Sequence, residues 1–187
     1  RQPSPAMASV DPSTLHRVEA ELDRVGLLMQ HDRTLPSVTS LVVGGPIAGS
    51  WWSHPRAHEI YDLLIAFEGG AGALSVKLVN GKVTFVHERL WPSLLARVES
   101  PLDSERAALS PRAAELLRLV EQRGCVRSSE LGANLGSARE VKKSLGELEA
   151  KVLVHVASEH TASGAHAKVL RSWAEWGKAH RTSPRAR

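Results

Sequence analysis

The sequence predicts an α+β protein in which N-terminal helices and a β-hairpin precede a second, mainly helical module that ends in another hairpin. Apolar residues recur at helical spacing in several segments, and two β-rich runs flank an Asn-Gly pair in ALSVKLVNGKVTFVH. A connector with a proline and several charges, SPLDSERAAL, separates the two modules. The predicted organisation is residues 1–10 disordered or left from cloning, 11–103 an N-terminal module, 104–176 a second domain and 177–187 a basic tail.

Two helices are predicted in the N-terminal module. The first spans residues 11–31, where Asp11 or Ser13 can cap the start. Its apolar face consists of Leu15, Val18, Leu22 and Val25. The second begins near Ser53 or His54 and runs to Phe67, with a proline in its first turn and a glycine pair after its end. Between the two helices lies a short segment, LPSVTSLVVGG, that ends in glycines.

The clearest local signal is a hairpin over residues 74–87. Both positions of its turn, Asn80 and Gly81, require positive φ, and Asn-Gly is a pair that readily supplies it. The residues that share a face are Leu74, Val76 and Leu78 in one strand, and Val83, Phe85 and His87 in the other. A helix over about residues 88–98 completes the module.

The predicted order of elements in the second domain is helix, short strand, helix, tight turn, helix and hairpin. Ser110-Pro111 opens the first helix and Gly124 ends it. A short helix then places Leu131 and Leu135 inward, and Gly136 turns the chain into the third helix. The buried stripe of that third helix is predicted to be Val141, Leu145, Leu148 and Val152. The segments VLVHVAS and AHAKVLRSW form the strands of the final hairpin, joined by EHTASG.

This order, from about Ser110 to Trp173, resembles the winged helix-turn-helix superfamily. The resemblance implies a DNA-binding protein, such as a regulator or a DNA-repair-associated factor, with 137–151 as the recognition helix and 158–167 as the wing. The DNA-binding residues that it implies are Ser137, Arg139, Lys142, Lys143, Gly146, His160, Thr161, His166, Lys168 and Arg171. A minority of winged helices mediate only protein contacts, so a protein-interaction module is an alternative.

The chemistry of these side chains suits DNA. Arg139 can read guanine bidentately, lysines can meet phosphates or base edges, and Gly146 permits close backbone approach. Ser137 at the helix start can donate to a phosphate beside free backbone N–H groups. Against this interpretation, the same helix contains Glu140, Glu147 and Glu149, which bring it close to neutral and suit a merely solvated helix face.

The composition of the chain bears on its partner and its cellular compartment. The net charge of +4 and the pI of about 9.6 are compatible with nucleic-acid binding. A lone Cys125 excludes an intrachain disulfide framework and fits a reducing compartment. No apolar run approaches the roughly 20 residues that cross a bilayer. We therefore expect an intracellular, cytoplasmic protein, associated with the nucleoid if it binds DNA, with duplex DNA as its partner and no membrane contact.

The cluster SWWSHPRAHE has several interpretations. Its tryptophans suit core packing, a homodimer contact joined by Trp173 and Trp176, or stacking on unpaired bases. In the last case the second nucleic-acid contact comprises Trp51, Trp52, His54, Arg56 and His58. A nuclease-like or glycosylase-like enzyme built on this cluster is a further alternative.

A catalytic or metal-binding role for this cluster lacks its usual residue pattern. His54 and His58, with Glu59 and His87, fall short of a zinc pattern and of the HExxH order. A P-loop, a dinucleotide-binding glycine turn and a GxSxG motif are all missing from the sequence. We therefore predict no metal, no cofactor and no catalytic residue.

Overall fold

The computed structural model describes residues 10–68, 72–99, 103–131, 135–160 and 166–181; of residues 159–160, 166–167 and 181 it describes the backbone only. Helices and strands both contribute, so the predicted α+β class is confirmed. The chain divides into two compact units, unit 1 (Arg1–Trp91) and unit 2 (Pro92–Arg187). The sequence places its domain boundary farther along, at the connector near residue 103.

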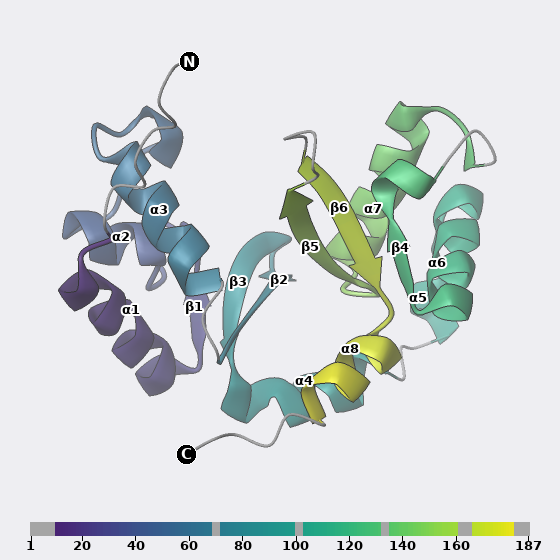
Figure 1. Ribbon diagram of the computed structural model, residues 1–187, viewed down its shortest axis with the longest axis horizontal. Coiled ribbons are helices and arrows are strands. Elements are labelled where there is room, and N and C mark those ends of the chain that lie inside the picture. The colour runs from purple at the N-terminus through teal and green to yellow at the C-terminus, as the bar shows by residue number, and fades with distance from the viewer. Residues whose placement is uncertain (1–9, 69–71, 100–102, 132–134, 161–165, 182–187) are drawn as a thin grey trace. The chain divides into compact units, whose positions relative to one another are not determined.

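Unit 1 combines three helices with a three-stranded antiparallel sheet, and Figure 1 shows the helices on one side of that sheet. Its elements are α1 (Pro12–Val25), β1 (Leu27–Met29), α2 (Val38–Val43), the 3-10 turn η1 (Trp51–Ser53), α3 (Ala57–Glu68), β2 (Ala73–Val79), β3 (Lys82–His87) and the 3-10 turn η2 (Glu88–Leu90). The strand order is β1-β3-β2. The register places Leu28 opposite Phe85, and both belong to the core between helices and sheet.

The helix expected over 11–31 ends earlier, which corrects that prediction. Asp11 caps α1 as expected, accepting from the amides of Ser13 and Thr14. Gly26, at φ +80°, then closes the helix, with its N–H donating to the carbonyl of Leu22 at 2.7 Å. The next three residues form β1 because they pair with β3, a partner that is distant in sequence. The segment LPSVTSLVVGG contains α2, a short helix opened by a Ser37–Ser40 capping box.

The predicted hairpin is present as β2 and β3. Asn80 and Gly81 both have positive φ, at 50° and 69°, which is the conformation that their sequence predicts. Beyond the turn, the pairing runs from Val79–Lys82 to Ala73–His87, with an irregularity between Val76 and Val79.

Replacing Gly81 by alanine is expected to lower the free energy of unfolding of unit 1 by about 1 kcal/mol, because an L-residue is strained at this φ. A Cβ at Gly81 meets nothing within 4 Å, so only the backbone strain acts. Gly45→Ala is the matched control, since its Cβ also meets nothing and its φ is not left-handed. Urea denaturation that gives equal changes for the two variants contradicts the prediction.

Unit 2 surrounds a second core with helices and another three-stranded antiparallel sheet, of order β4-β6-β5. Its elements are α4 (Trp91–Val98, which begins at the last residue of unit 1), α5 (Asp103–Ala107), α6 (Pro111–Arg123), β4 (Cys125–Arg127), the 3-10 turn η3 (Ser128–Glu130), α7 (Ala138–Ala150), β5 (His155–His160), β6 (His166–Arg171) and α8 (Trp173–Arg181). Ser110 caps α6 and Gly124 ends it, both as predicted. Leu131 and Leu135 are buried as expected, although residues 132–134 lie outside the described part of the chain.

The C-terminal end of unit 2 differs from expectation. Trp173 and Trp176 belong to α8, a helix that the sequence pattern did not assign, and both are 3% exposed. Their rings lie 5.8 and 5.9 Å from the ring of His155. The N–H of Trp173 donates to the carbonyl of Val152 at 2.8 Å. Both tryptophans are therefore core residues, which argues against the alternative in which they take part in a contact between two copies of the chain.

Candidate nucleic-acid interface

Helix α7 presents one face to the core of unit 2 and the opposite face to solvent. Ser137 caps its start, and Ser144, Leu145 and Leu148 are its buried residues. The stripe predicted from the sequence is thus confirmed at its centre, whereas Val141 and Val152 are only half-buried. Val152 also adopts a positive φ of 54°, since it lies in the turn that follows the helix.

The solvent face of α7 is basic. Arg139, Lys142 and Lys143 are exposed and, at positions i, i+3 and i+4, share that face. Arg139 and Lys142 make no hydrogen bond or ion pair with any residue that the structure describes. Gly146, one turn further, is open: a Cβ built there meets nothing within 4 Å. The predicted residues 139, 142, 143 and 146 therefore come together on one accessible surface, which we call the α7 basic face.

Two of the three glutamates of α7 have partners elsewhere. The carboxylate of Glu147 accepts from the backbone N–H of Ser110 at 2.8 Å and from its hydroxyl at 2.7 Å. These bonds lower the pKa of Glu147 and attach α7 to the first turn of α6. The side chain of Glu149 is 15% exposed and lies 3.9 Å from the ammonium of Lys168. Both carboxylates therefore have partners outside the α7 basic face, and Glu147 also interacts electrostatically with Lys143.

The third glutamate changes the expected role of Ser137. The backbone N–H and the hydroxyl of Ser137 both donate to Glu140 Oε2, at 2.7 and 2.8 Å. The Glu140 N–H donates back to the Ser137 hydroxyl at 3.3 Å, which completes a capping box, and the bonds from Ser137 lower the pKa of Glu140. The N–H and hydroxyl of Ser137 are thus occupied by a carboxylate and do not serve a phosphate. The sequence signal for this is Ser-x-x-Glu at 137–140.

The structure describes the side chains of only some of the residues that were predicted to bind DNA in and beside the wing. Thr161 lies outside the described residues, and the side chains of His160 and His166 are not described. Lys168 and Arg171 are an odd number of positions apart on β6, so they point to opposite faces of the sheet. Lys168 lies on the side of the sheet where Glu149 of α7 is found. The structure therefore associates Lys168 with α7 and separates Arg171 from it.

Arg171 lies near a buried histidine that sequence reasoning missed. His155, opposite Arg171 in the strand register, is 9% exposed, and its Nδ1 has no hydrogen-bond partner among the described residues. Burial, and then the positive charge of Arg171 and the nearby His180, lower the pKa of His155 to about 4. The signal in the sequence was weak, because a histidine in a strand is compatible with an exposed position as well.

The Trp/His cluster of unit 1 is divided between core and surface. Trp51 is 8% exposed and belongs to the core of unit 1, whereas Trp52 is 60% exposed and stacks on it with 4.0 Å between ring centroids. His54 Nδ1 accepts from the Arg56 N–H at 3.1 Å, so His54 acts as a turn cap. Arg56 forms an ion pair with Glu59, and His58 is exposed. Five predicted contact residues thus do not form one basic surface.

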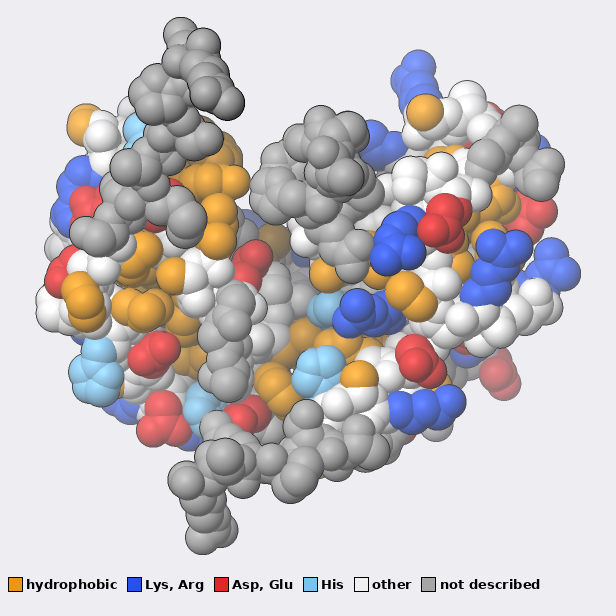
Figure 2. All heavy atoms as spheres, viewed as in Figure 1, with side chains coloured by type: hydrophobic (Ala, Val, Ile, Leu, Met, Phe, Trp, Pro, Cys, Tyr) orange, Lys and Arg blue, Asp and Glu red, His pale blue; other side chains and the backbone are white. Residues whose placement is uncertain are grey.

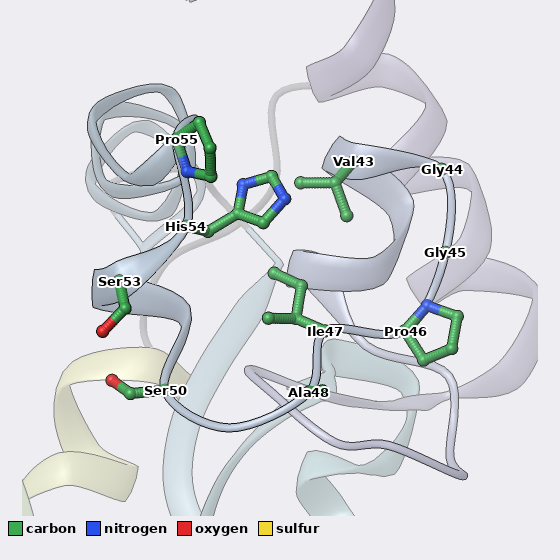
Figure 3. A pocket seen from close by; sticks show the side chains of 10 residues that line it. All are labelled: Val43, Gly44, Gly45, Pro46, Ile47, Ala48, Ser50, Ser53, His54 and Pro55. Atoms are coloured by element: carbon green, nitrogen blue, oxygen red, sulfur yellow. The ribbon is translucent and has the colours of Figure 1, made fainter.

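A hollow of about 400 Å³ lies beside this cluster (Figure 3). Its lining residues are Val43, Gly44, Gly45, Pro46, Ile47, Ala48, Ser50, Ser53, His54 and Pro55. The His54 ring lies near Val43 and Ile47, and the lining contains two serine hydroxyls but no Lys, Arg, Asp or Glu. Such a lining offers no countercharge for a phosphate.

Among the residues that the structure describes, no group of three or more His, Cys, Asp or Glu is placed to hold a metal ion. Within the same part of the chain, no helix has the length and apolar character needed to cross a membrane. Comparisons with protein-family models, with curated proteins and with solved structures find no match to this chain.

Proposed function

We propose that unit 2 is a winged-helix domain that binds duplex DNA through the α7 basic face. The order α6, β4, η3, α7, β5, β6, together with the sheet order β4-β6-β5, supports the fold assignment. The observation that carries the function is the accessibility of Arg139, Lys142 and Lys143, while Glu147 and Glu149 are engaged elsewhere.

The distribution of charge supports the same assignment. Unit 2 contains 16 Lys and Arg against 11 Asp and Glu, whereas unit 1 contains 8 against 9. Lys and Arg side chains are visible over the surface of unit 2 in Figure 2. The excess positive charge of the chain therefore resides in the unit that holds α7, which favours a polyanionic partner there.

In the proposed complex α7 enters the major groove. Arg139, near the helix start, reads a guanine edge, and Lys142 and Lys143 bind phosphates or base edges. The missing side chain at Gly146 lets the helix backbone approach the groove wall. Lys168, on the sheet side that faces Glu149, contacts the flanking phosphates.

The test is the fluorescence anisotropy of a labelled 20-base-pair duplex and of the matching single strand, measured at 50 and 200 mM salt. Three phosphate contacts predict an affinity for the duplex that falls about 40-fold between these concentrations. We expect weaker binding of the single strand, because a helix fits the major groove of a duplex. Binding that is independent of salt, or equal for both forms, contradicts the proposal.

Removing the charge of Glu140 is expected to strengthen duplex binding. Glu140→Gln keeps the capping box, since glutamine makes the same hydrogen bonds, but it withdraws a negative charge from the start of α7. We expect the dissociation constant to fall severalfold, about 3- to 10-fold at 0.1 M salt. Glu121→Gln on α6 is the control for the same change in net charge. Equal affinities of the two variants contradict this role for Glu140.

A further inference from the structure

The exposed side of α3 carries an apolar surface in unit 1. Trp52 is 60% exposed and Ile65 is 42% exposed. Tyr61, four residues before Ile65 on the same side of α3, has its ring centroid 5.6 Å from that of Trp52. We call these three residues the α3 aromatic face. Figure 2 shows hydrophobic side chains at the surface in this part of unit 1.

Trp52 is held in place by its neighbour. Its ring lies on that of Trp51 with 4.0 Å between centroids and an interplanar angle of 24°. Trp51 is itself packed in the core with Ile60 and Leu64 of α3. One side of the Trp52 indole is therefore covered by Trp51, while the residue as a whole stays 60% exposed. Trp52 therefore loses little side-chain entropy when a ligand stacks on it, because its ring is already held against Trp51.

Helix α3, which carries Tyr61 and Ile65, is acidic. Helix α3 contains Glu59, Asp62 and Glu68 and no Lys or Arg. The nearest cation in sequence, Arg56, is bound to Glu59 through two hydrogen bonds. Asp62 directly follows Tyr61 and makes no ion pair with a described residue. The carboxylate of Asp62, three residues before Ile65 on α3, thus favours a cationic group over a phosphate, which argues against use of this surface as a second nucleic-acid contact.

We propose that the α3 aromatic face binds a basic polypeptide segment. An arginine of the partner stacks on the open side of the Trp52 indole, where the ring face attracts a cation. The carboxylate of Asp62 supplies the countercharge, and an apolar side chain of the partner covers Ile65. This interaction is separate from DNA binding and rests on residues of unit 1 alone.

The probe is the acetylated peptide (Arg-Leu)4, with (Glu-Leu)4 as the reversed-charge control, titrated into the full chain by isothermal calorimetry. Because the chain has a net charge of +4, a basic peptide is not drawn to it by overall charge. We expect binding of (Arg-Leu)4 only. Trp52→Ala and Asp62→Asn should each lower the affinity for (Arg-Leu)4 about tenfold. Trp52→Phe should keep most of the wild-type affinity, because phenylalanine also presents an aromatic face.

Leu35→Ala removes another exposed apolar side chain of unit 1, at 46% exposure, and should leave peptide binding unchanged. Far-ultraviolet circular dichroism confirms that each variant is folded, which we expect because Trp52 lies at the surface. Three results overturn the proposal: no binding of (Arg-Leu)4, equal binding of both peptides, or unchanged affinity in Trp52→Ala. Competition by a dT12 oligonucleotide at this face, lost in Trp52→Ala, assigns the face to nucleic acid and also overturns it.

Discussion

Replacing Arg139 and Lys143 together by alanine is expected to weaken duplex binding about 30-fold at 0.15 M salt. Loss of the Lys143 phosphate contact removes about 0.9 from the slope of log affinity against log salt, and loss of Arg139 removes its hydrogen bonds to the guanine edge. If the double variant loses more affinity for one particular DNA sequence than for other sequences, Arg139 reads a base. The measurement is the duplex anisotropy titration repeated at four salt concentrations.

Arg118→Ala with Arg123→Ala is the matched control. Both arginines are exposed on α6, so this variant loses the same two charges from the same unit but leaves α7 intact. We expect the dissociation constant for the duplex to rise less than threefold, because this variant only weakens the overall positive field of the protein. If both double variants lose affinity equally, DNA binding depends on net charge, and the recognition role of α7 is excluded.

Acidification from pH 6.5 to pH 4 is expected to lower the free energy of unfolding of unit 2 by about 3 kcal/mol through His155 alone. Its pKa is about 4 in the folded protein against 6.5 for a free histidine, because the ring is buried beside Arg171. The unfolded chain therefore binds the proton more readily than the folded one. The contribution is complete above pH 6.5 and is lost as the pH falls toward 4.

His155→Phe separates this effect from the titration of carboxylates. Phenylalanine fills the space between Trp173 and Trp176 without a titratable group. The variant should keep a nearly constant free energy of unfolding between pH 6.5 and 4.5, above the range in which most carboxylates titrate. Urea denaturation at pH 6.5, 5.5 and 4.5 measures the difference. If the free energy of unfolding falls equally with pH in the wild type and the variant, the effect does not come from His155.

Elements whose signals are local could be predicted from the sequence. Ser110 and Ser137 cap α6 and α7 with their own side chains, and both turn positions of Asn80-Gly81 have the expected positive φ. In each case the residue that determines the structure lies within three positions of the bond or torsion that it controls. Such features depend little on the rest of the chain.

Elements that depend on distant partners were missed. Leu27–Met29 continue the apolar periodicity of α1, but they pair with β3 instead. Trp173 and Trp176 suit a surface contact as well as a core, and only their packing on His155 decides between these. For the candidate site, the spacing of residues 139, 142, 143 and 146 was sufficient to place them on one face. The partners of Glu147 and Lys168 were not predictable, because Ser110 and Glu149 belong to other elements.

The pairing of β1 with β3 has a consequence for the order of folding. The turn at Asn80-Gly81 closes over two residues, so β2 and β3 can form a hairpin within microseconds of meeting. Strand β1 pairs with β3 later, because α2 and α3 separate the two strands in the sequence. Closing so long a loop costs conformational entropy and therefore slows the pairing. During synthesis the N-terminal helix emerges well before β3, and it gains a sheet to pack on only after the hairpin has left the ribosome. We therefore expect hydrogen-exchange pulse labelling to protect the amides of β2 and β3 before those of Leu27–Met29.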